Sequence, residues 1–253
     1  MFEADLLLGR ELAVLSANVA MEHFRRGVRV RRKADGSKVT DADLAVEVAL
    51  LELLAPRRPD DAILSEERGA IGASRRRWLL DPIDGTSYFA AGSPEQWGTH
   101  IALEVDGEIV LGLITRPVTE QCWWAVKGGG AHCGALRSHA SDRVLRVRTT
   151  SELSRCTAVF WAESEDECRR RDLLKTKAHL VDQTMDCVLE LVAGRLDLVI
   201  CGASKPWDLA PGVVIVEEAG GQFSDPAGGR RLDLGEGWYS NGPLHRQARE
   251  LFT

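Results

Sequence analysis

The sequence predicts a mixed α and β protein built as two lobes, and three observations support this prediction. Apolar residues recur at helical spacing near the N-terminus, and two β-like runs are joined by the turn signal Asp106-Gly107. From about residue 145 onward, strands and helices alternate. The chain has 253 residues and can bury a substantial core. We therefore expect a first lobe over residues 1–145 and a second lobe over residues 146–253.

The composition narrows the class of protein. A hydrophobic content of 44% and a charged content of 28% are typical of a globular chain, and the net charge of −6 argues against a nonspecific nucleic-acid binder. No apolar segment approaches the ~20 residues of a membrane span, and charges interrupt the N-terminal run, unlike a secretion signal. The six cysteines form no C-x-x-C pair. We expect a cytoplasmic protein with reduced thiols and without nucleic-acid or membrane partners.

The first lobe is predicted to begin with two helices, over residues 2–24 and from Asp41 to about Ala55, before Pro56. Thr40 and Asp43 form a weak capping box at the start of the second helix, which is one explanation for Asp43. Strands are predicted over residues 62–65, 78–80, 99–105, 108–114 and 121–126. The glycine-rich residues 128–130 lack the Lys-Ser/Thr of a phosphate-binding loop and are expected to form a turn.

The second lobe is predicted to alternate between the two kinds of element. Strands are expected over residues 157–161, 196–200 and 222–224, and helices over residues 184–193, 205–219 and 244–252. Two glycines follow the long apolar helix of residues 205–219 and are expected to stop it. We find no internal repeat and no low-complexity segment.

The stretch Trp78–Thr86, WLLDPIDGT, is the most informative part of the chain. Its apolar start predicts a buried strand that ends at Asp81, and Pro82 stiffens the exit from that strand. We expect Asp81 and Asp84 on one short turn, where carboxylates about 4 Å apart repel by roughly 4 kcal/mol at an effective dielectric near 20. A hard cation such as Mg²⁺ would reverse that repulsion. An ordinary turn remains the alternative, because Asp, Pro and Gly are all turn residues.

Five acidic residues share one property: each is predicted at the boundary of a helix or strand, where a side chain can point into a cleft. They are Asp43, Glu66, Asp81, Asp84 and Asp208. Two of them, Glu66 and Asp81, end successive predicted strands, and ligands commonly gather at the carboxyl ends of sheet strands.

In this order and context, these residues resemble the inositol monophosphatase family of metal-dependent phosphatases. The resemblance spans roughly residues 30–225. It is carried by Val39–Asp43, the Glu66-Glu67 pair, Trp78–Thr86 in full, Trp207–Ala210 and Glu217–Gly221. It implies a layered α-β-α-β-α sandwich, the sugar-phosphatase-like fold, with two lobes and the site in the cleft between them. It also implies a homodimer.

The resemblance further implies hydrolysis of a small-molecule phosphate monoester by a metal-activated water, with two or three Mg²⁺ ions. The implied metal ligands are Glu66, Asp81, the Ile83 carbonyl, Asp84 and Asp208. The implied catalytic residues are Asp43 and Thr86, which deprotonate or orient the water, together with Glu66. The implied phosphate-site residues are Asp84, Gly85 and Thr86. Phosphoryl transfer needs positioning and charge stabilisation more than a protein nucleophile. We therefore predict no phosphoenzyme and no catalytic cysteine or histidine, and expect the histidines to serve in packing or at the surface.

Several stretches look particularly like the histidinol-phosphate phosphatase branch of this family. They are residues 32–37, 96–103, 123–125 and 240–245. Two departures lie where the alcohol half of the substrate would bind: Cys201 replaces a usual glutamate, and residues 181–186 replace a Gly-Ser/Thr-Ala loop. Histidinol phosphate is the first candidate substrate, and inositol, another sugar or cyclitol phosphate, or a nucleotide-type phosphate are the alternatives. Lithium inhibition is a further implication of the family.

Two other classes of function stay open at this point. A non-catalytic regulator that binds a metal or an anion would bind metal normally and turn over no phosphate ester. An RNA-associated partner protein is suggested only by local arginine clusters, and the net acidity weighs against it. A salt-dependent gel shift at physiological ionic strength would support that second class.

Overall fold

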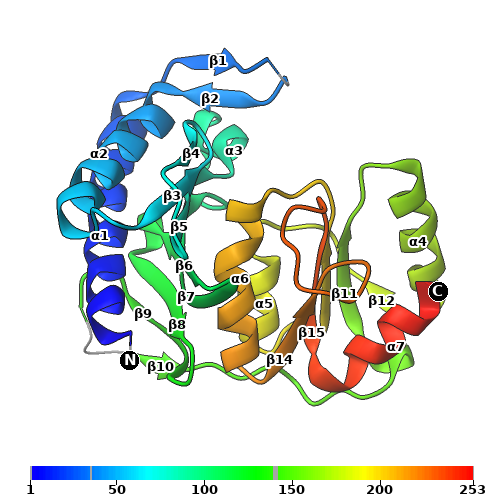
Figure 1. Ribbon diagram of the computed structural model, residues 1–253. Coiled ribbons are helices and arrows are strands. Elements are labelled where there is room, and N and C mark those ends of the chain that lie inside the picture. The colour runs from blue at the N-terminus through cyan, green and yellow to red at the C-terminus, as the bar shows by residue number, and fades with distance from the viewer. Residues whose placement is uncertain (1, 35, 139–141, 253) are drawn as a thin grey trace.

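The protein folds as five layers, and the computed structural model describes residues 2–34, 36–138 and 142–252 (Figure 1). One outer layer consists of helices α1 (Glu3–Arg26) and α2 (Asp41–Arg57). The central layer consists of α5 (Cys187–Val192) and α6 (Pro206–Glu218). The other outer layer consists of α4 (Glu165–Lys175) and α7 (Gly242–Phe252). Two sheets separate these layers. The α-β-α-β-α sandwich predicted from the sequence is confirmed. Asp35, part of the stretch 32–37 singled out above, lies outside the described residues.

The first sheet has eight strands in the order β10-β9-β8-β7-β6-β5-β3-β4. In chain order the strands are β3 (Ala62–Ser65), β4 (Gly69–Ile71), β5 (Arg76–Asp84), β6 (Gly98–Val105), β7 (Glu108–Arg116), β8 (Gln121–Val126), β9 (Gly130–Ala135) and β10 (Arg143–Val144). Neighbouring strands are antiparallel except β3 and β5, which run parallel. The β6–β7 hairpin turns at Asp106-Gly107, both with positive φ, as the Asp-Gly signal predicts.

The second sheet has five strands in the order β12-β11-β13-β15-β14. In chain order they are β11 (Thr157–Trp161), β12 (His179–Leu180), β13 (Leu198–Cys201), β14 (Gly221–Ser224) and β15 (Gly237–Asn241). A separate ribbon of β1 (Val30–Arg32) and β2 (Lys38–Thr40) projects above α2, and a short helix α3 (Thr86–Ala90) follows β5 (Figure 1). Short 3₁₀ turns lie at Pro117–Thr119 and Leu153–Arg155.

Helix α6 joins the two sheets, because its apolar surface faces both. It contacts β5 to β9 of the first sheet and β14 and β15 of the second. Gly112 in β7 permits this packing, since a Cβ there would lie 2.5 Å from the Pro211 carbonyl oxygen. The first turn of α6 carries Asp208. The helix that fills the space between the sheets therefore also brings Asp208 to the first sheet.

Three local predictions are wrong. Strand β5 does not end at Asp81 but continues to Asp84 with a bulge, so the two aspartates lie on a bulged strand and not on a turn. Helix α2 runs to Arg57, because Pro56 falls in its last turn, where little helix remains to be disrupted. Helix α5 begins at Cys187 and not at Thr184, since tertiary contacts hold the preceding loop.

Within the described ranges, no helix is both long enough and apolar enough to span a bilayer.

Candidate active site

The parallel pairing of β3 with β5 brings the first two acidic residues together. Ser65 of β3 is in register with Leu80 of β5, and the Glu66 N–H donates to the Leu80 carbonyl at 3.1 Å. Glu66 therefore follows β3 at the level where β5 reaches Asp81. Glu66 and Asp81 therefore lie at the same level of neighbouring strands, although β5 continues past Asp81 to Asp84.

Asp43 uses its two carboxylate oxygens for different purposes. Its Oδ2 accepts hydrogen bonds from the Thr40 N–H, at 2.8 Å, and from the Thr40 hydroxyl. Thr40 Oγ1 in turn accepts a hydrogen bond from the Asp43 N–H at 3.4 Å, which completes the predicted capping box. Its Oδ1 lies 3.1 Å from Thr86 Oγ1. The Thr86 hydroxyl also lies 3.1 Å from the Ile83 carbonyl oxygen, so its single proton can go to either acceptor. The capping role and the pairing with Thr86 are thus compatible.

Asp208 reaches the same place from the second half of the chain. Its Oδ2 accepts a hydrogen bond from the Lys205 N–H at 2.7 Å, which fixes the side chain at the start of α6. Burial and the neighbouring Asp84 carboxylate raise the pKa of Asp208 to about 7. The carboxylates of Asp81, Asp84 and Asp208 therefore share one electrostatic environment, although about 120 residues separate the last from the first two.

The carboxylates are crowded and incompletely paired. Among the described residues, Asp81 Oδ1 and Asp84 Oδ2 are buried and accept no hydrogen bond. Burial raises the pKa of Asp81, and the nearby charges of Glu66, Asp84 and Asp208 raise it further. Clustered carboxylate oxygens with a carbonyl at Ile83 are the donors that Mg²⁺ prefers. The residues present fit a site for divalent cations.

Lys33 is a cationic contact that the sequence analysis did not identify. Its Nζ lies 2.7 Å from Glu66 Oε1 and 2.6 Å from Glu67 Oε1. Burial raises the pKa of Glu67 to about 7.

Glu47 of α2 is a second residue that the sequence analysis did not identify. Its Oε1 accepts hydrogen bonds from the N–H groups of Glu67 and Arg68, at 3.2 and 3.1 Å, and so holds the turn that carries Glu66. Its spacing of four residues from Asp43 on one helix face could have indicated this role.

His100 is the third residue that sequence reasoning missed. In the antiparallel pairing of β5 with β6, His100 lies directly opposite Asp81. Its Nε2 is 3.3 Å from Asp84 Oδ2. Ligand atoms of Asp81, Asp84 and His100 all lie within 4.8 Å of one another. His100 therefore belongs to the acidic cluster, which the general expectation for the histidines did not include.

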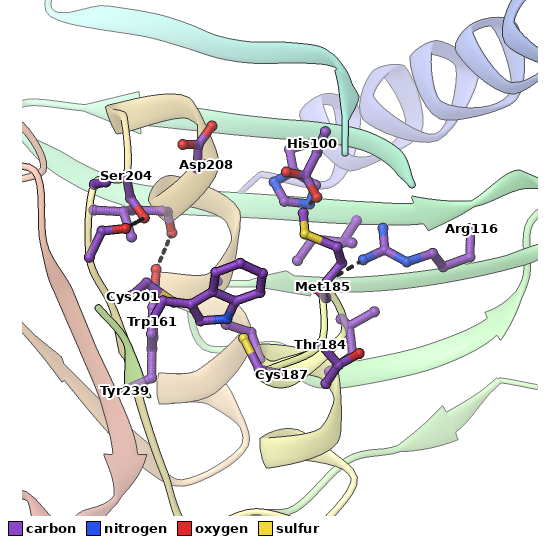
Figure 2. Close-up of a pocket in the computed structure, with 18 residues that line it drawn as sticks. His100, Arg116, Trp161, Thr184, Met185, Cys187, Cys201, Ser204, Asp208 and Tyr239 are labelled. Carbon is purple, nitrogen blue, oxygen red and sulfur yellow. Dashed lines mark hydrogen bonds and ion pairs between the residues drawn. The ribbon is translucent and has the colours of Figure 1, made fainter. Parts of the chain in front are cut away.

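A cavity of about 200 Å³ opens beside these residues (Figure 2). We call Asp84, His100 and Asp208 its carboxylate end. Its apolar end is formed by Trp161, Cys187, Cys201 and Tyr239.

The polar groups at the apolar end are already paired or neutral. The Tyr239 hydroxyl donates to the Leu209 carbonyl at 2.7 Å. A hydrogen bond with Cys187, together with burial, raises the pKa of the Cys201 thiol. The apolar end therefore presents the aromatic ring of Trp161 and the neutral thiol of Cys201 to a ligand.

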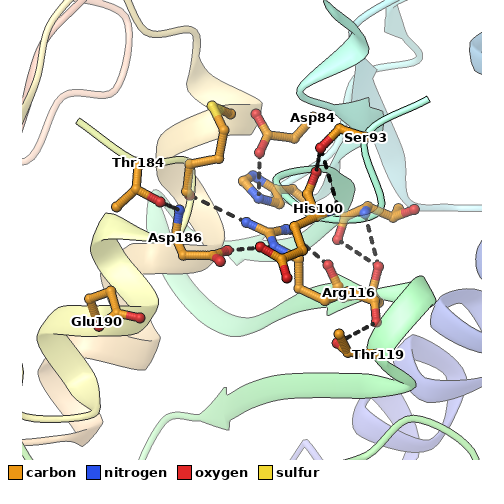
Figure 3. A network of polar contacts seen from close by, with 12 residues as sticks. Asp84, Ser93, His100, Arg116, Thr119, Thr184, Asp186 and Glu190 are labelled. Atoms are coloured by element: carbon orange, nitrogen blue, oxygen red, sulfur yellow. Dashed lines mark hydrogen bonds and ion pairs between the residues drawn. The ribbon is translucent and has the colours of Figure 1, made fainter. Parts of the chain in front are cut away.

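Arg116 fixes the loop at one side of this cavity (Figure 3). It lies at the end of β7 and is buried. Its Nε donates to Asp186 Oδ1 at 2.6 Å, and its Nη2 donates to the Met185 carbonyl at 3.3 Å. This contact explains why residues 184–186 form a loop in front of α5. The loop lies within residues 181–186, one of the two regions where the sequence departs from the family pattern.

Comparisons with known proteins show which proteins this chain is similar to. A family model described as the inositol monophosphatase family matches residues 6–252. A protein of Streptomyces griseus named glucose-1-phosphate thymidylyltransferase is 42% identical, over 91% of this chain and 89% of that protein. A histidinol-phosphatase of Chlorobaculum parvum is 34% identical, over 93% of this chain and 91% of the relative. The solved structure of an inositol monophosphatase from Zymomonas mobilis aligns with a TM-score of 0.84 and 31% identity, covering 100% of this chain and 98% of that one.

Proposed function

Because the chain belongs to the inositol monophosphatase family and is a phosphoric monoester hydrolase, we propose that it cleaves the phosphate ester of a small alcohol in a site that holds Mg²⁺. One observation carries this proposal. Carboxylates from β5 and from the start of α6 converge beside the Thr86–Asp43 pair, with their charges uncompensated. Such a cluster suits a reaction that needs cations next to a phosphate dianion.

The residues have distinct roles in this proposal. Glu66, Asp81, the Ile83 carbonyl, Asp84 and Asp208 would hold the cations. Bound cations would supply charge neutralisation for the phosphate and a lowered pKa for the attacking water.

The Thr86 hydroxyl orients the attacking water. When it donates its proton to Asp43 Oδ1, its lone pairs face outward and can accept a hydrogen bond from water. Thr40 keeps the Asp43 carboxylate in place by bonding to the other oxygen. The water proton can then pass through the Thr86 hydroxyl to Asp43. Glu66 lies close enough for its negative charge to act on the Asp43 carboxylate.

The phosphate would lie against the start of α3. Gly85 has φ +80°, and a Cβ there would lie 2.3 Å from the Gln96 carbonyl oxygen, so this position requires glycine. The N–H groups of Gly85 and Thr86 are the proposed phosphate contacts, with Asp84 next to them. The proposed contacts therefore come from a turn whose close packing against Gln96 only glycine allows.

Histidinol phosphate is the first candidate substrate. Histidinol-phosphatases are among the relatives of this chain, and a flat imidazole ring suits a cavity end formed by Trp161 and two thiols. Inositol or another sugar or cyclitol phosphate is the alternative, but its hydroxyl groups would find few free polar partners there. A nucleotide-type phosphate is the remaining alternative.

The test is phosphate release from a panel containing histidinol phosphate, inositol 1-phosphate, glucose 1-phosphate and a nucleoside monophosphate, with and without Mg²⁺. Asp84→Asn should lower release at least about 100-fold, as expected for loss of a group that stabilises transition-state charge. Asp172→Asn on the exposed surface of α4 is the matched control and should leave release unchanged. Undiminished release without metal, or in Asp84→Asn, would contradict the proposal.

Two further measurements in the same experiment distinguish the other classes of function. Pyrophosphate formed from glucose 1-phosphate and thymidine triphosphate would indicate nucleotidyl transfer, which the name of the Streptomyces griseus relative denotes. Metal binding without turnover of any ester would indicate a regulator.

We also propose a homodimer in the cytoplasm. Sedimentation of the full chain tests the dimer, and dosing the assay with Li⁺ tests lithium inhibition.

A further inference from the structure

Two buried histidines of this protein have opposite surroundings. His100 and His245 each expose only 7% of their surface. His245 Nδ1 lies 2.8 Å from Ser240 Oγ, and its Nε2 lies 2.9 Å from Ser224 Oγ, so both ring nitrogens have partners. Neither ring nitrogen of His100 makes a hydrogen bond within the described part of the chain, and its Nε2 only approaches the Asp84 carboxylate, at 3.3 Å. Burying an imidazole without such partners is costly, which points to a ligand that His100 is placed to meet.

The backbone register determines where the His100 side chain lies. Asp81 and His100 are directly opposed on antiparallel strands, and residues opposed in this way project to the same face of the sheet. The bulge after Asp81 turns Asp84 toward the same place, where its Oδ2 lies 3.3 Å from His100 Nε2. Figure 3 shows the ring directed at the Asp84 carboxylate.

We propose that His100 donates an imidazole nitrogen to a divalent cation held by Asp81 and Asp84. This inference rests on the proposed metal centre and adds a nitrogen donor to a site otherwise composed of oxygens. Ligands of one ion at about 2.2 Å each lie at most roughly 4.4 Å apart. The three donor atoms lie within 4.8 Å of one another, so small side-chain rotations complete the site.

The expected consequence is a changed metal preference. Imidazole suits transition metals, whereas Mg²⁺ prefers oxygen donors and water. Compared with an all-oxygen site, this protein should therefore favour Mn²⁺ and Co²⁺ relative to Mg²⁺. This preference concerns binding and can be measured without turnover.

The experiment uses the full chain and two matched variants, His100→Asn and His245→Asn. Mn²⁺ and Mg²⁺ affinities are measured by calorimetry, and nitrogen coupling to bound Mn²⁺ is measured by pulsed electron paramagnetic resonance. We expect imidazole nitrogen coupling in the wild type and in His245→Asn, and its loss in His100→Asn. The Mn²⁺ affinity of His100→Asn should fall about 10-fold or more, and its Mg²⁺ affinity by much less.

Three results would overturn the inference, and they are distinguishable. Tight Mn²⁺ binding by the wild type without imidazole coupling would leave the metal centre in place and exclude His100 from it. Equal losses of Mn²⁺ and Mg²⁺ affinity in His100→Asn would mean that His100 only orients Asp84. No divalent binding by the wild type would overturn the metal centre and the His100 inference together. The wild-type spectrum does not depend on a variant, so the test holds even if His100→Asn fails to fold.

Discussion

The carboxylate end and the apolar end of the cavity come from different parts of the chain and are built in different ways. The carboxylate end depends on adjacent strands β5 and β6 and on the first turn of α6. The apolar end is formed by β11, β13, β15 and the start of α5, largely in the second sheet. The difference predicts that the chemical step and the choice of alcohol can be changed separately. Changes at one end should alter the rate of the chemical step, and changes at the other should alter which ester is preferred.

The largest expected effect comes from a pair of threonines, Thr86, which is paired with Asp43 near the carboxylate end, and Thr184, on the loop beside the apolar end. Thr86→Ala removes the hydroxyl that bridges Asp43 and the Ile83 carbonyl, and should lower kcat by about 10²–10⁴-fold, as for loss of general-base assistance. Thr184→Ala removes the hydroxyl of a residue that lines the cavity and should mainly change KM. Steady-state kinetics of both variants tests whether the effects on kcat and on KM are separable. Thr86→Ser keeps the hydroxyl and is the conservative variant that should restore kcat. An unchanged kcat in Thr86→Ala would remove the proposed role of Thr86.

A smaller effect is expected from restoring the family's acidic residue at the apolar end. Cys201→Glu places a carboxylate where this chain has a neutral thiol, and Cys201→Ser is the control of matched size. The ratio of kcat/KM for inositol 1-phosphate over an aryl phosphate should rise about 10-fold or more in Cys201→Glu, because hydroxyl groups gain a partner. The test is to measure this ratio for Cys201→Glu and for Cys201→Ser. A ratio that does not move would mean that the apolar end does not select the alcohol.

Much of the fold was predictable from local patterns. The Asp-Gly turn between β6 and β7, the capping box at Thr40 and the apolar run of α6 each depend on residues near one another in sequence. The five layers were predicted from the family resemblance, which depends on short motifs. Helix α4 was missed because, of its residues, only Leu174 is buried, so it has no strong apolar period.

The carboxylate end was only partly predictable. Asp81 and Asp84 were expected close together, and they are, but on a bulged strand and not on a turn. His100 could not be found from its neighbours, because its position opposite Asp81 depends on the register between two strands. The loop before α5 depends on Arg116, which lies 70 residues away from Asp186 in the sequence. Residues that are placed by tertiary contacts leave no local signal.

The smallest expected effect concerns stability and pH, and again it separates the two ends. Asp208 and Glu67 have pKa values raised to about 7 in the folded protein, so the native metal-free state binds more protons than the unfolded chain between about pH 4 and 7. Their contribution to stability is therefore present below about pH 4 and is lost as the pH rises through 7. Bound Mg²⁺ should reverse this trend, because it binds the deprotonated carboxylates.

Thermal unfolding with a chelator and with excess Mg²⁺, from pH 5 to pH 8, tests this linkage. The metal-free Tm should fall with rising pH by at least about 2–4 °C, the shift that ~1 kcal/mol produces in a chain of this size, and the stabilisation by Mg²⁺ should grow over the same interval. Asp208→Asn should flatten the metal-free curve because it removes one of the titrating groups. Cys201→Ser at the apolar end should leave its slope unchanged, since the raised pKa keeps that thiol neutral throughout. A metal-free Tm that rises from pH 5 to 7 would show that the protein itself already compensates the negative charges of the carboxylate end. The electrostatic argument for a cation at that end would then fail.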